Sequence, residues 1–315
     1  MGGPDSSLAH GAHGATSGVR QPWGNELDGF LGRAWFPGAG TKVACAVSGG
    51  ADSLALVALA VRAGCQVTAV HVDHGTRPGS AGEAAAVAEV VGRLGAGFEA
   101  RRVRVEAGPN LEARWRAARM EALPTGALTG HTADDQAETM LLNLIRGAGL
   151  DGLAGIRPGP TKPILGLRRS ETRRVCSLMG LVPLEDPTNV DPSFRRNRVR
   201  HELLPLLDAI GERDVGGVLA RQARLLREDG DLLDQLAAAI DAQDARALAG
   251  APAPLARRAV RLWLGGDHPP DGAAVERVLA VARGEAVACE LPGGGRIERS
   301  GMRLRRLPPR RSGLG

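Results

Sequence analysis

The first segment of the sequence with residues suited to chemistry is a glycine pair flanked by hydroxyl and carboxylate side chains. Two adjacent glycines let the backbone approach a phosphate group closely, and a helix that begins directly after them presents free N–H groups to an anion. No lysine follows at the spacing of G-x-x-x-x-G-K-[ST], so this is not the loop of ordinary nucleoside triphosphatases. The predicted phosphate loop consists of Ser48, Gly49, Gly50, Ala51, Asp52 and Ser53.

Asp52 is the unexpected member of this loop, because an acid stands where a phosphate-binding loop usually carries a lysine. Its carboxylate can cap the following helix, or it can help to hold Mg²⁺ beside bound phosphates. The structural alternative is a glycine-rich turn with an Asp/Ser helix cap and no ligand.

A second group of candidates combines a histidine with three acids. Asp134 and Asp135 precede Glu138 by four and three residues, so a helix places these acids on one face, and His131 lies one turn earlier. Acids in a first turn also stabilise the helix through its dipole, by about 0.3–1 kcal/mol each. This stabilisation is the alternative to a catalytic role.

Four arginines surround Asn197, after a loop rich in Pro, Asn and Asp and ahead of a predicted helix. They are Arg195, Arg196, Arg198 and Arg200. Guanidinium groups at this density bind phosphates or a polyanion through bidentate hydrogen bonds. The alternative is the solvated basic start of a helix.

A histidine and acid segment ends the second predicted strand. Strand alternation places His71 and Asp73 on one face, and His74 and Arg77 follow in the turn. A metal site is one interpretation, but the segment offers no third ligand at a metal-binding spacing.

The elements that must position these residues alternate between strands and helices. Apolar or alternating runs at 42–48, 65–75, 97–106 and 125–131 predict four strands, with helical segments between and after them. Because strand–helix–strand units build parallel sheets, the predicted fold is α/β with a doubly wound, mostly parallel sheet. Ligands of such folds bind beyond the carboxyl ends of the strands.

Leu/Ala/Arg-rich segments replace the strands after residue 211 and predict a smaller helical C-terminal domain. We expect a disordered tail at 1–24, an α/β domain at 25–210, a helical domain at 211–307 that ends in a β-hairpin, and a basic tail at 308–315.

The composition is that of a globular protein with a mild basic excess. Hydrophobic residues make up 43% and charged residues 24% of the chain, and the formal net charge of +5 favours a polyanionic partner. The four cysteines form no C-x-x-C pair, which argues against a zinc ribbon or a redox dithiol. Neither a signal peptide nor a membrane span is predicted, so we expect a cytoplasmic protein.

Together the motifs resemble those of a known family. S-G-G-x-D-S at the end of a first strand is similar to the signature of the PP-loop ATP pyrophosphatases. H-x-D-H-x-x-R from His71, H-x-x-D-D-Q-x-E-T from His131 and R-N-x-x-R-H from Arg196 resemble segments of tRNA(Ile)-lysidine synthetases within that group. The resemblance runs continuously over about residues 42–207.

This resemblance implies an enzyme that uses ATP and Mg²⁺. The implied reaction adenylates the C2 oxygen of the wobble cytidine of tRNA(Ile) with a CAU anticodon, and free L-lysine then displaces AMP to give lysidine. The implied catalytic domain is 25–210, and the helical part at 211–307 is expected to contact tRNA.

The resemblance also implies site roles. The phosphate loop binds ATP, and Asp52 holds Mg²⁺. Catalysis is expected of Asp52, His131, Asp134, Asp135 and Arg196, with Asp134 or Asp135 holding the lysine ammonium and His131 or a carboxylate receiving its proton. The residues near the nucleotide are His71, Asp73, His74 and Arg77, and those contacting tRNA or the adenylate are Arg195, Arg198 and Arg200.

Two alternatives stay open. Another PP-loop tRNA enzyme inserts sulfur into cytidine, but that chemistry commonly needs the cysteine pairs that this chain lacks. A nucleotide-binding or RNA-binding module without catalysis does not need Asp52, Asp134 and Asp135 together. A homodimer is one candidate assembly.

Overall fold

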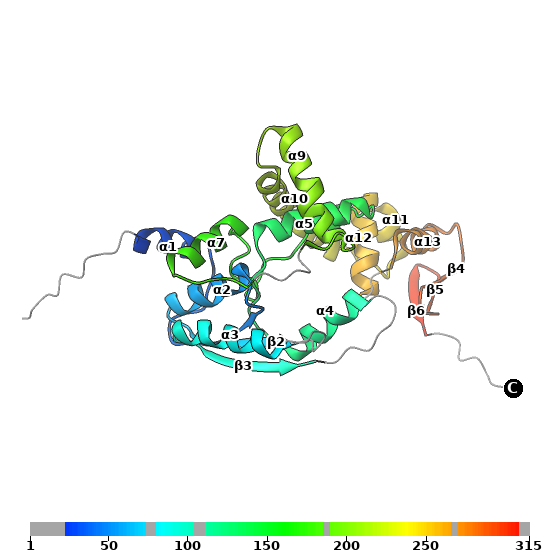
Figure 1. Ribbon diagram of the computed structural model, residues 1–315. Coiled ribbons are helices and arrows are strands. Elements are labelled where there is room, and N and C mark those ends of the chain that lie inside the picture. The colour runs from blue at the N-terminus through cyan, green and yellow to red at the C-terminus, as the bar shows by residue number, and fades with distance from the viewer. Residues whose placement is uncertain (1–22, 74–79, 104–110, 185–189, 266–269, 309–315) are drawn as a thin grey trace, which may run out of the picture. The chain divides into compact units, whose positions relative to one another are not determined.

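The computed structural model describes residues 23–73, 80–103, 111–184, 190–265 and 270–308 (Figure 1). The tails predicted at 1–24 and 308–315 therefore fall almost entirely outside the described residues.

The chain divides into two compact units. The first comprises Met1–Ala133 and Pro158–Asn189, and the second comprises Asp134–Arg157 and Val190–Gly315. This division differs from the boundary expected at residue 210, because the helix that carries Asp134 and Asp135 is grouped with the later helices and binds Arg196 and Arg200 through its acids.

A parallel sheet forms the centre of the first unit. Its strands are β1 (Lys42–Val47), β2 (Gln66–Asp73) and β3 (Gly97–Arg102), in the order β1-β2-β3. The fourth predicted strand is reduced to a single parallel bridge between Leu128 and Cys45. Leu128 exchanges hydrogen bonds with Ala44 and Ala46, and the next amide, that of Thr129, bonds to the Thr161 carbonyl instead. The chain therefore leaves the sheet after one residue.

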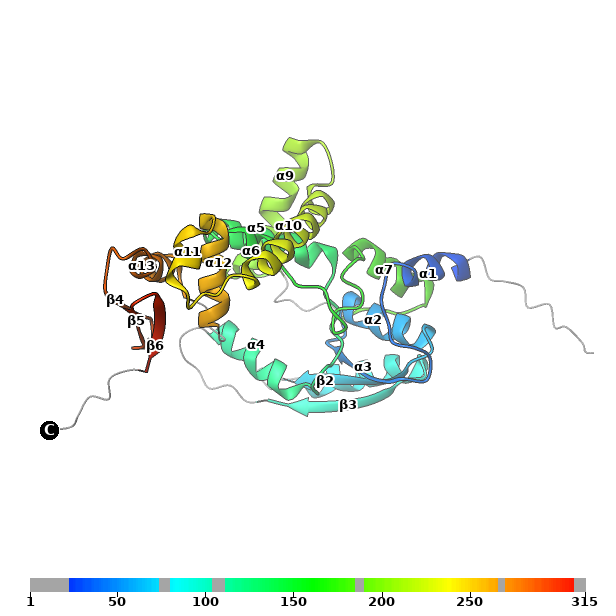
Figure 2. The same cartoon turned by 180° about the vertical axis from the view of Figure 1, so that it is seen from behind.

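Helices of the first unit cover both faces of this sheet. These helices are α1 (Trp23–Leu31), α2 (Ala51–Arg62), α3 (Ser80–Arg93), α4 (Leu111–Ala122) and α7 (Arg169–Leu178). Cys45 and Val67 pack in a core with residues of α2 and α3, whereas Ala46 and Val70 pack on the other face with Leu123. Both views show α7 beside α2 and α1 beside α7 (Figures 1 and 2). The predicted doubly wound α/β fold is confirmed.

The order of the sheet indicates where a ligand is expected to bind. From β1 the chain adds β2 and then β3 on one side, and it returns to the other side of β1 at Leu128. Ligands of open α/β sheets bind where the strand order reverses in this way. The segments that follow β1 and Leu128 are those with the predicted phosphate loop and His131.

The second unit is mostly helical, as predicted for the C-terminal region. Its elements are α5 (Ala133–Ile145, of which Ala133 counts with the first unit), α6 (Leu150–Leu153), α8 (Arg195–Arg198), the π-helical turn η2 (Val199–Leu203), α9 (Leu204–Gly211), α10 (Val215–Ala238), α11 (Ala245–Gly250), α12 (Ala253–Leu264), α13 (Gly272–Arg283), β4 (Ala288–Glu290), β5 (Arg296–Ser300) and β6 (Arg303–Leu307).

The predicted terminal hairpin is β5–β6, and β4 adds a third antiparallel strand to it. A core from α10 to β6 includes Leu248, Val260, Val278 and Ile297. Among the described residues, no helix combines the length and apolar character that crossing a bilayer requires.

Candidate functional site

The phosphate loop has a backbone that requires glycine at its centre. Gly49 follows β1 with a φ of +85°, and its carbonyl accepts a hydrogen bond from the Leu184 amide at 2.9 Å. A Cβ at this position would lie 2.8 Å from Leu184 Cδ1 and 2.9 Å from Val87 Cγ2. Both the left-handed backbone and the tight packing therefore exclude a larger residue.

The start of α2 is arranged to receive an anion. Ser53 Oγ donates to the Gly50 carbonyl at 2.8 Å and accepts from the Ser48 amide at 3.1 Å, which closes the loop on itself. Gly50 is the N-cap of α2, and no described side chain caps this helix. Because the first amides of a helix have no partner within it, a phosphate can accept from them and interact with the positive end of the helix dipole.

Asp52 lies in the first turn of α2 and contacts α7 of the same unit. Thr172 Oγ1 donates to Asp52 Oδ1, and Arg169 Nε lies 3.3 Å from Asp52 Oδ2. Neither Arg169 nor Thr172 was predicted, because both are more than a hundred residues from Asp52 in the sequence. The signal that the sequence offered was a basic segment from Lys162 that ends with two adjacent arginines, Arg168 and Arg169, at the start of α7.

The Asp52 carboxylate is an oxygen ligand in the first turn of α2, directly after the predicted phosphate position. Mg²⁺ is usually bound through one or two carboxylates together with the phosphates of a substrate, so this residue fits the predicted role. Among the described residues, no cluster of three His, Cys, Asp or Glu side chains forms a metal centre.

Gly130 brings a second segment against the loop. A Cβ at Gly130 would lie 2.8 Å from the Asp52 carbonyl oxygen, so the backbone after Leu128 passes directly beside the first turn of α2. His131 follows, and its Nδ1 lies 2.8 Å from Thr129 Oγ1, which donates its only proton to the Thr161 carbonyl at 3.0 Å. Nδ1 then donates to Thr129 Oγ1, and this hydrogen bond helps to fix the orientation of the His131 ring.

His71 is buried near the carboxyl end of β2, and the contacts described for it are with residues of the neighbouring strands. Its Nδ1 donates to the Val47 carbonyl at 3.0 Å, and its ring stacks on Phe98 with 6.4 Å between centroids. Asp73 Oδ2 lies 3.9 Å from Arg102 Nε. The other two residues predicted near the nucleotide, His74 and Arg77, lie outside the described residues.

A buried carboxylate organises the second unit's candidate residues. Glu138 in α5 is fully buried, and Arg196 Nε donates to its Oε2 at 2.7 Å. Arg200 binds the same carboxylate through Nε to Oε1 at 2.7 Å and through a terminal nitrogen to Oε2 at 3.1 Å. Asp135, one turn earlier, accepts from Arg196 at 3.1 Å. Two acids and two guanidiniums thus form one charge-balanced cluster.

The predicted arginine cluster divides into two pairs. Arg196 and Arg200 are four residues apart and both bind Glu138, whereas Arg195 and Arg198 are exposed. Arg198 forms an ion pair with Glu202 at 2.9 Å. Glu138 is the organising residue of the cluster. Its spacing in the sequence pointed to a shared face with the aspartates, but not to these arginine partners.

Asp134 is half-buried in the first turn of α5. Its neighbour Gln136 is buried and holds the loop after α5, donating to the Ala154 carbonyl at 2.9 Å and accepting from the Ile156 amide at 2.7 Å. These two hydrogen bonds therefore hold the first turns of α5, which carry the acids, against the loop at 154–156.

The four cysteines are unsuited to thiolate chemistry. None forms a disulfide, and burial raises the pKa of every thiol, to about 12 for Cys45 and about 11 for Cys176. The thiolate is the nucleophilic form, so these side chains are poor nucleophiles at neutral pH.

Comparison with known proteins gives one consistent family. The family model of the PP-loop domain matches residues 29–207. The chain is 46% identical to the tRNA(Ile)-lysidine synthase of Nocardia farcinica, over 86% of this chain and 92% of that protein. It is 45% identical to the protein of the same name from Rhodococcus erythropolis, over 71% of this chain and 74% of that one. It is 42% identical to the protein of that name from Mycolicibacterium paratuberculosis, over 81% of this chain and 87% of that protein.

Proposed function

We propose a reaction for this chain, which belongs to the tRNA(Ile)-lysidine synthase family of PP-loop proteins: ATP-dependent ligation of free L-lysine to C2 of the wobble cytidine of tRNA(Ile) with a CAU anticodon. The family and the ligase-type activity predicted from the motifs are confirmed. The observation that carries the proposed ATP site is the phosphate loop, with Gly49 at a φ of +85° and an uncapped start of α2 directly behind it.

The first step transfers AMP to the substrate. The C2 oxygen of the cytidine attacks the α-phosphorus of ATP, the bond to the bridging oxygen breaks, and pyrophosphate leaves. The amides at the start of α2 and the Ser48 hydroxyl are placed to receive the charge on that leaving group. Bound Mg²⁺ supplies further charge neutralisation, and Asp52 is its proposed protein ligand.

The second step needs a neutral amine. The lysine Nζ attacks C2, the bond from C2 to the adenylated oxygen breaks, and AMP leaves. At pH 7 an amine with a pKa of about 10.4 is deprotonated in only about one molecule in 2,500, so a base is required. His131 is the proposed acceptor of the proton, because histidine is the side chain that most often acts as a general base and its neighbour Gly130 lies against the first turn of α2.

The acids and arginines of the second unit have proposed roles in the same step. Asp134 or Asp135 holds the lysine ammonium before deprotonation. Arg196 and Arg200, already oriented by Glu138, neutralise charge on the adenylate. The helical part at 211–307 contacts tRNA, and the reaction takes place in the cytoplasm.

Cytidine thiolation is the neighbouring activity in PP-loop tRNA enzymes, and the cysteines disfavour it. Three of the four thiols are buried, all four pKa values are raised, and the sequence has no C-x-x-C pair. A persulfide carrier needs an accessible thiolate.

The test is lysine incorporation into RNA. The purified protein is mixed with ATP, Mg²⁺, labelled lysine and bulk bacterial tRNA, and label is counted in acid-insoluble RNA. We expect labelling only of the tRNA(Ile) with a CAU anticodon, together with AMP and pyrophosphate. AMP formation without lysine incorporation would mean a different nucleophile, and a folded protein that forms neither product would be a binding module. Sedimentation of the same sample tests for a homodimer.

A further inference from the structure

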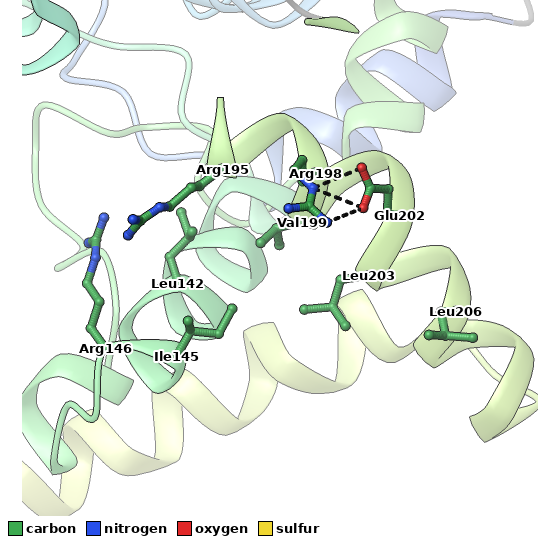
Figure 3. Close-up of a pocket in the computed structure, with 9 residues that line it drawn as sticks. All are labelled: Leu142, Ile145, Arg146, Arg195, Arg198, Val199, Glu202, Leu203 and Leu206. Carbon is green, nitrogen blue, oxygen red and sulfur yellow. Dashed lines mark hydrogen bonds and ion pairs between the residues drawn. The ribbon is translucent and has the colours of Figure 1, made fainter. Parts of the chain in front are cut away.

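A groove in the second unit lies outside the cluster around Glu138. It has a volume of about 440 Å³ and is formed by the C-terminal half of α5 together with α8, η2 and α9 (Figure 3). Aliphatic side chains make its floor: Leu142, Ile145, Val199, Leu203 and Leu206. Three arginines, Arg146, Arg195 and Arg198, line it as well.

Two of these arginines carry charge that no acid in the groove balances. Arg198 is held by Glu202 through contacts of 2.9–3.1 Å. Arg146 and Arg195, in contrast, make no ion pair with any residue that the structure describes, and both extend to the same side of the groove (Figure 3). The groove therefore offers two guanidiniums to an anionic occupant, and a guanidinium binds phosphate bidentately.

The floor is apolar and open to solvent. Ile145 is 63% exposed and Leu206 is 55% exposed. Exposed aliphatic side chains beside unpaired guanidiniums match a nucleotide, whose base is a flat apolar surface and whose phosphates are anionic. A base can pack on the aliphatic floor or stack on an Arg guanidinium plane.

The groove shares its elements with the cluster of Glu138. Arg195 lines the groove, and the next residue, Arg196, binds Glu138. On α5, Ile145 follows Glu138 by seven residues, which is about 10 Å along the helix axis at 1.5 Å per residue. Three steps between stacked nucleotides of one strand, at about 3.4 Å each, span about that length. A strand with one base near Glu138 therefore reaches the groove with a nearby nucleotide.

We propose that this groove binds a single-stranded nucleotide of the substrate RNA, close in sequence to the modified cytidine. Its base packs on the aliphatic floor, and its flanking phosphates pair with Arg146 and Arg195. This inference rests on the proposed function for the identity of the RNA.

The test separates the contributions that the arginines and the aliphatic floor of the groove make to RNA binding. Binding of a fluorescent anticodon stem-loop is measured over a range of salt concentrations for wild type, R146A/R195A, I145S and a control, R33A/R174A. The control removes two exposed arginines of the first unit, each paired with a glutamate and neither in the part of the chain proposed to contact tRNA. The three variants carry substitutions at exposed positions only, and circular dichroism checks that they are folded.

We expect R146A/R195A to reduce the slope of log affinity against log salt by about 1.4–1.8, or 0.7–0.9 for each lost phosphate contact. I145S should weaken binding about tenfold with an unchanged slope, because the base contact is not ionic. The control should bind with a slope close to that of wild type.

A slope for R146A/R195A equal to that of the control overturns the inference. So does unchanged RNA binding together with a change in sedimentation mass, because the groove would then be a protein interface. If wild type incorporates lysine but the slope does not change, only the groove proposal fails. If the slope changes but wild type incorporates no lysine, the groove binds RNA and the proposed function fails.

Discussion

Replacing Glu138 with Gln tests whether one buried carboxylate organises the second unit's cluster. The substitution keeps the side chain's shape but removes the charge that Arg196 and Arg200 share. Breaking a buried ion pair from one side costs about 3–5 kcal/mol, because the remaining charge is uncompensated. The two guanidiniums are 26% and 22% exposed, and Asp135 still accepts from Arg196. We therefore expect the lower end of this range, a loss of about 3 kcal/mol.

Urea unfolding followed by far-UV circular dichroism measures this loss. In a thermal melt of the same variant, the melting temperature should fall by about 6–12 °C, at about 2–4 °C for each kcal/mol of lost stability. The matched control is Glu228→Gln, which breaks the exposed pair with Arg224 and should cost no more than about 0.5 kcal/mol.

A double variant distinguishes charge imbalance from a packing defect. Combining Glu138→Gln with Arg196→Gln removes an unpaired guanidinium, so the two losses should fall short of additivity by at least about 1 kcal/mol. The reasoning is refuted if Glu138→Gln costs no more than the Glu228 control, or if the two losses simply add.

Three further predictions concern the first unit. Gly49→Ala should lower the melting temperature by several degrees and weaken ATP binding in a thermal-shift titration, since its Cβ would lie 2.8 Å from Leu184 at a φ of +85°; an unchanged melt contradicts this. Asp52→Asn should reduce pyrophosphate release about 100-fold or more while tRNA binding persists, because it loses the Mg²⁺ ligand; release within threefold of wild type excludes the role. The buried Cys45 thiol has its pKa raised from 9.0 to about 12, so the unfolded chain ionises first and stability falls above pH 9. At about pH 10.5 this amounts to about 2 kcal/mol, and Cys45→Ala should lack that part of the decline in denaturant melts.

The sequence by itself determined the features that depend on local spacing. The glycine-rich turn between β1 and α2, the first three strands with the helices that alternate with them and the helical character of the C-terminal region all follow from residue types and periods of two or 3.6. The shared face of Asp135 and Glu138 has the same origin, because helix geometry places residues three and four apart together. The family motifs added the expected chemistry to these positions.

Tertiary structure decided which side chains meet. Asp52 contacts Arg169 and Thr172, which are 117 and 120 residues later, and Glu138 binds Arg196 and Arg200, which are 58 and 62 residues later. Packing also reduced the fourth strand to one bridge at Leu128, and it joined α5 with the later helices rather than with the sheet. Contacts at such separations depend on how whole elements pack, and local spacing carries no information on that packing. The sequence therefore identified four basic residues around Asn197, and only the fold showed that two of them bind a buried acid while two face solvent.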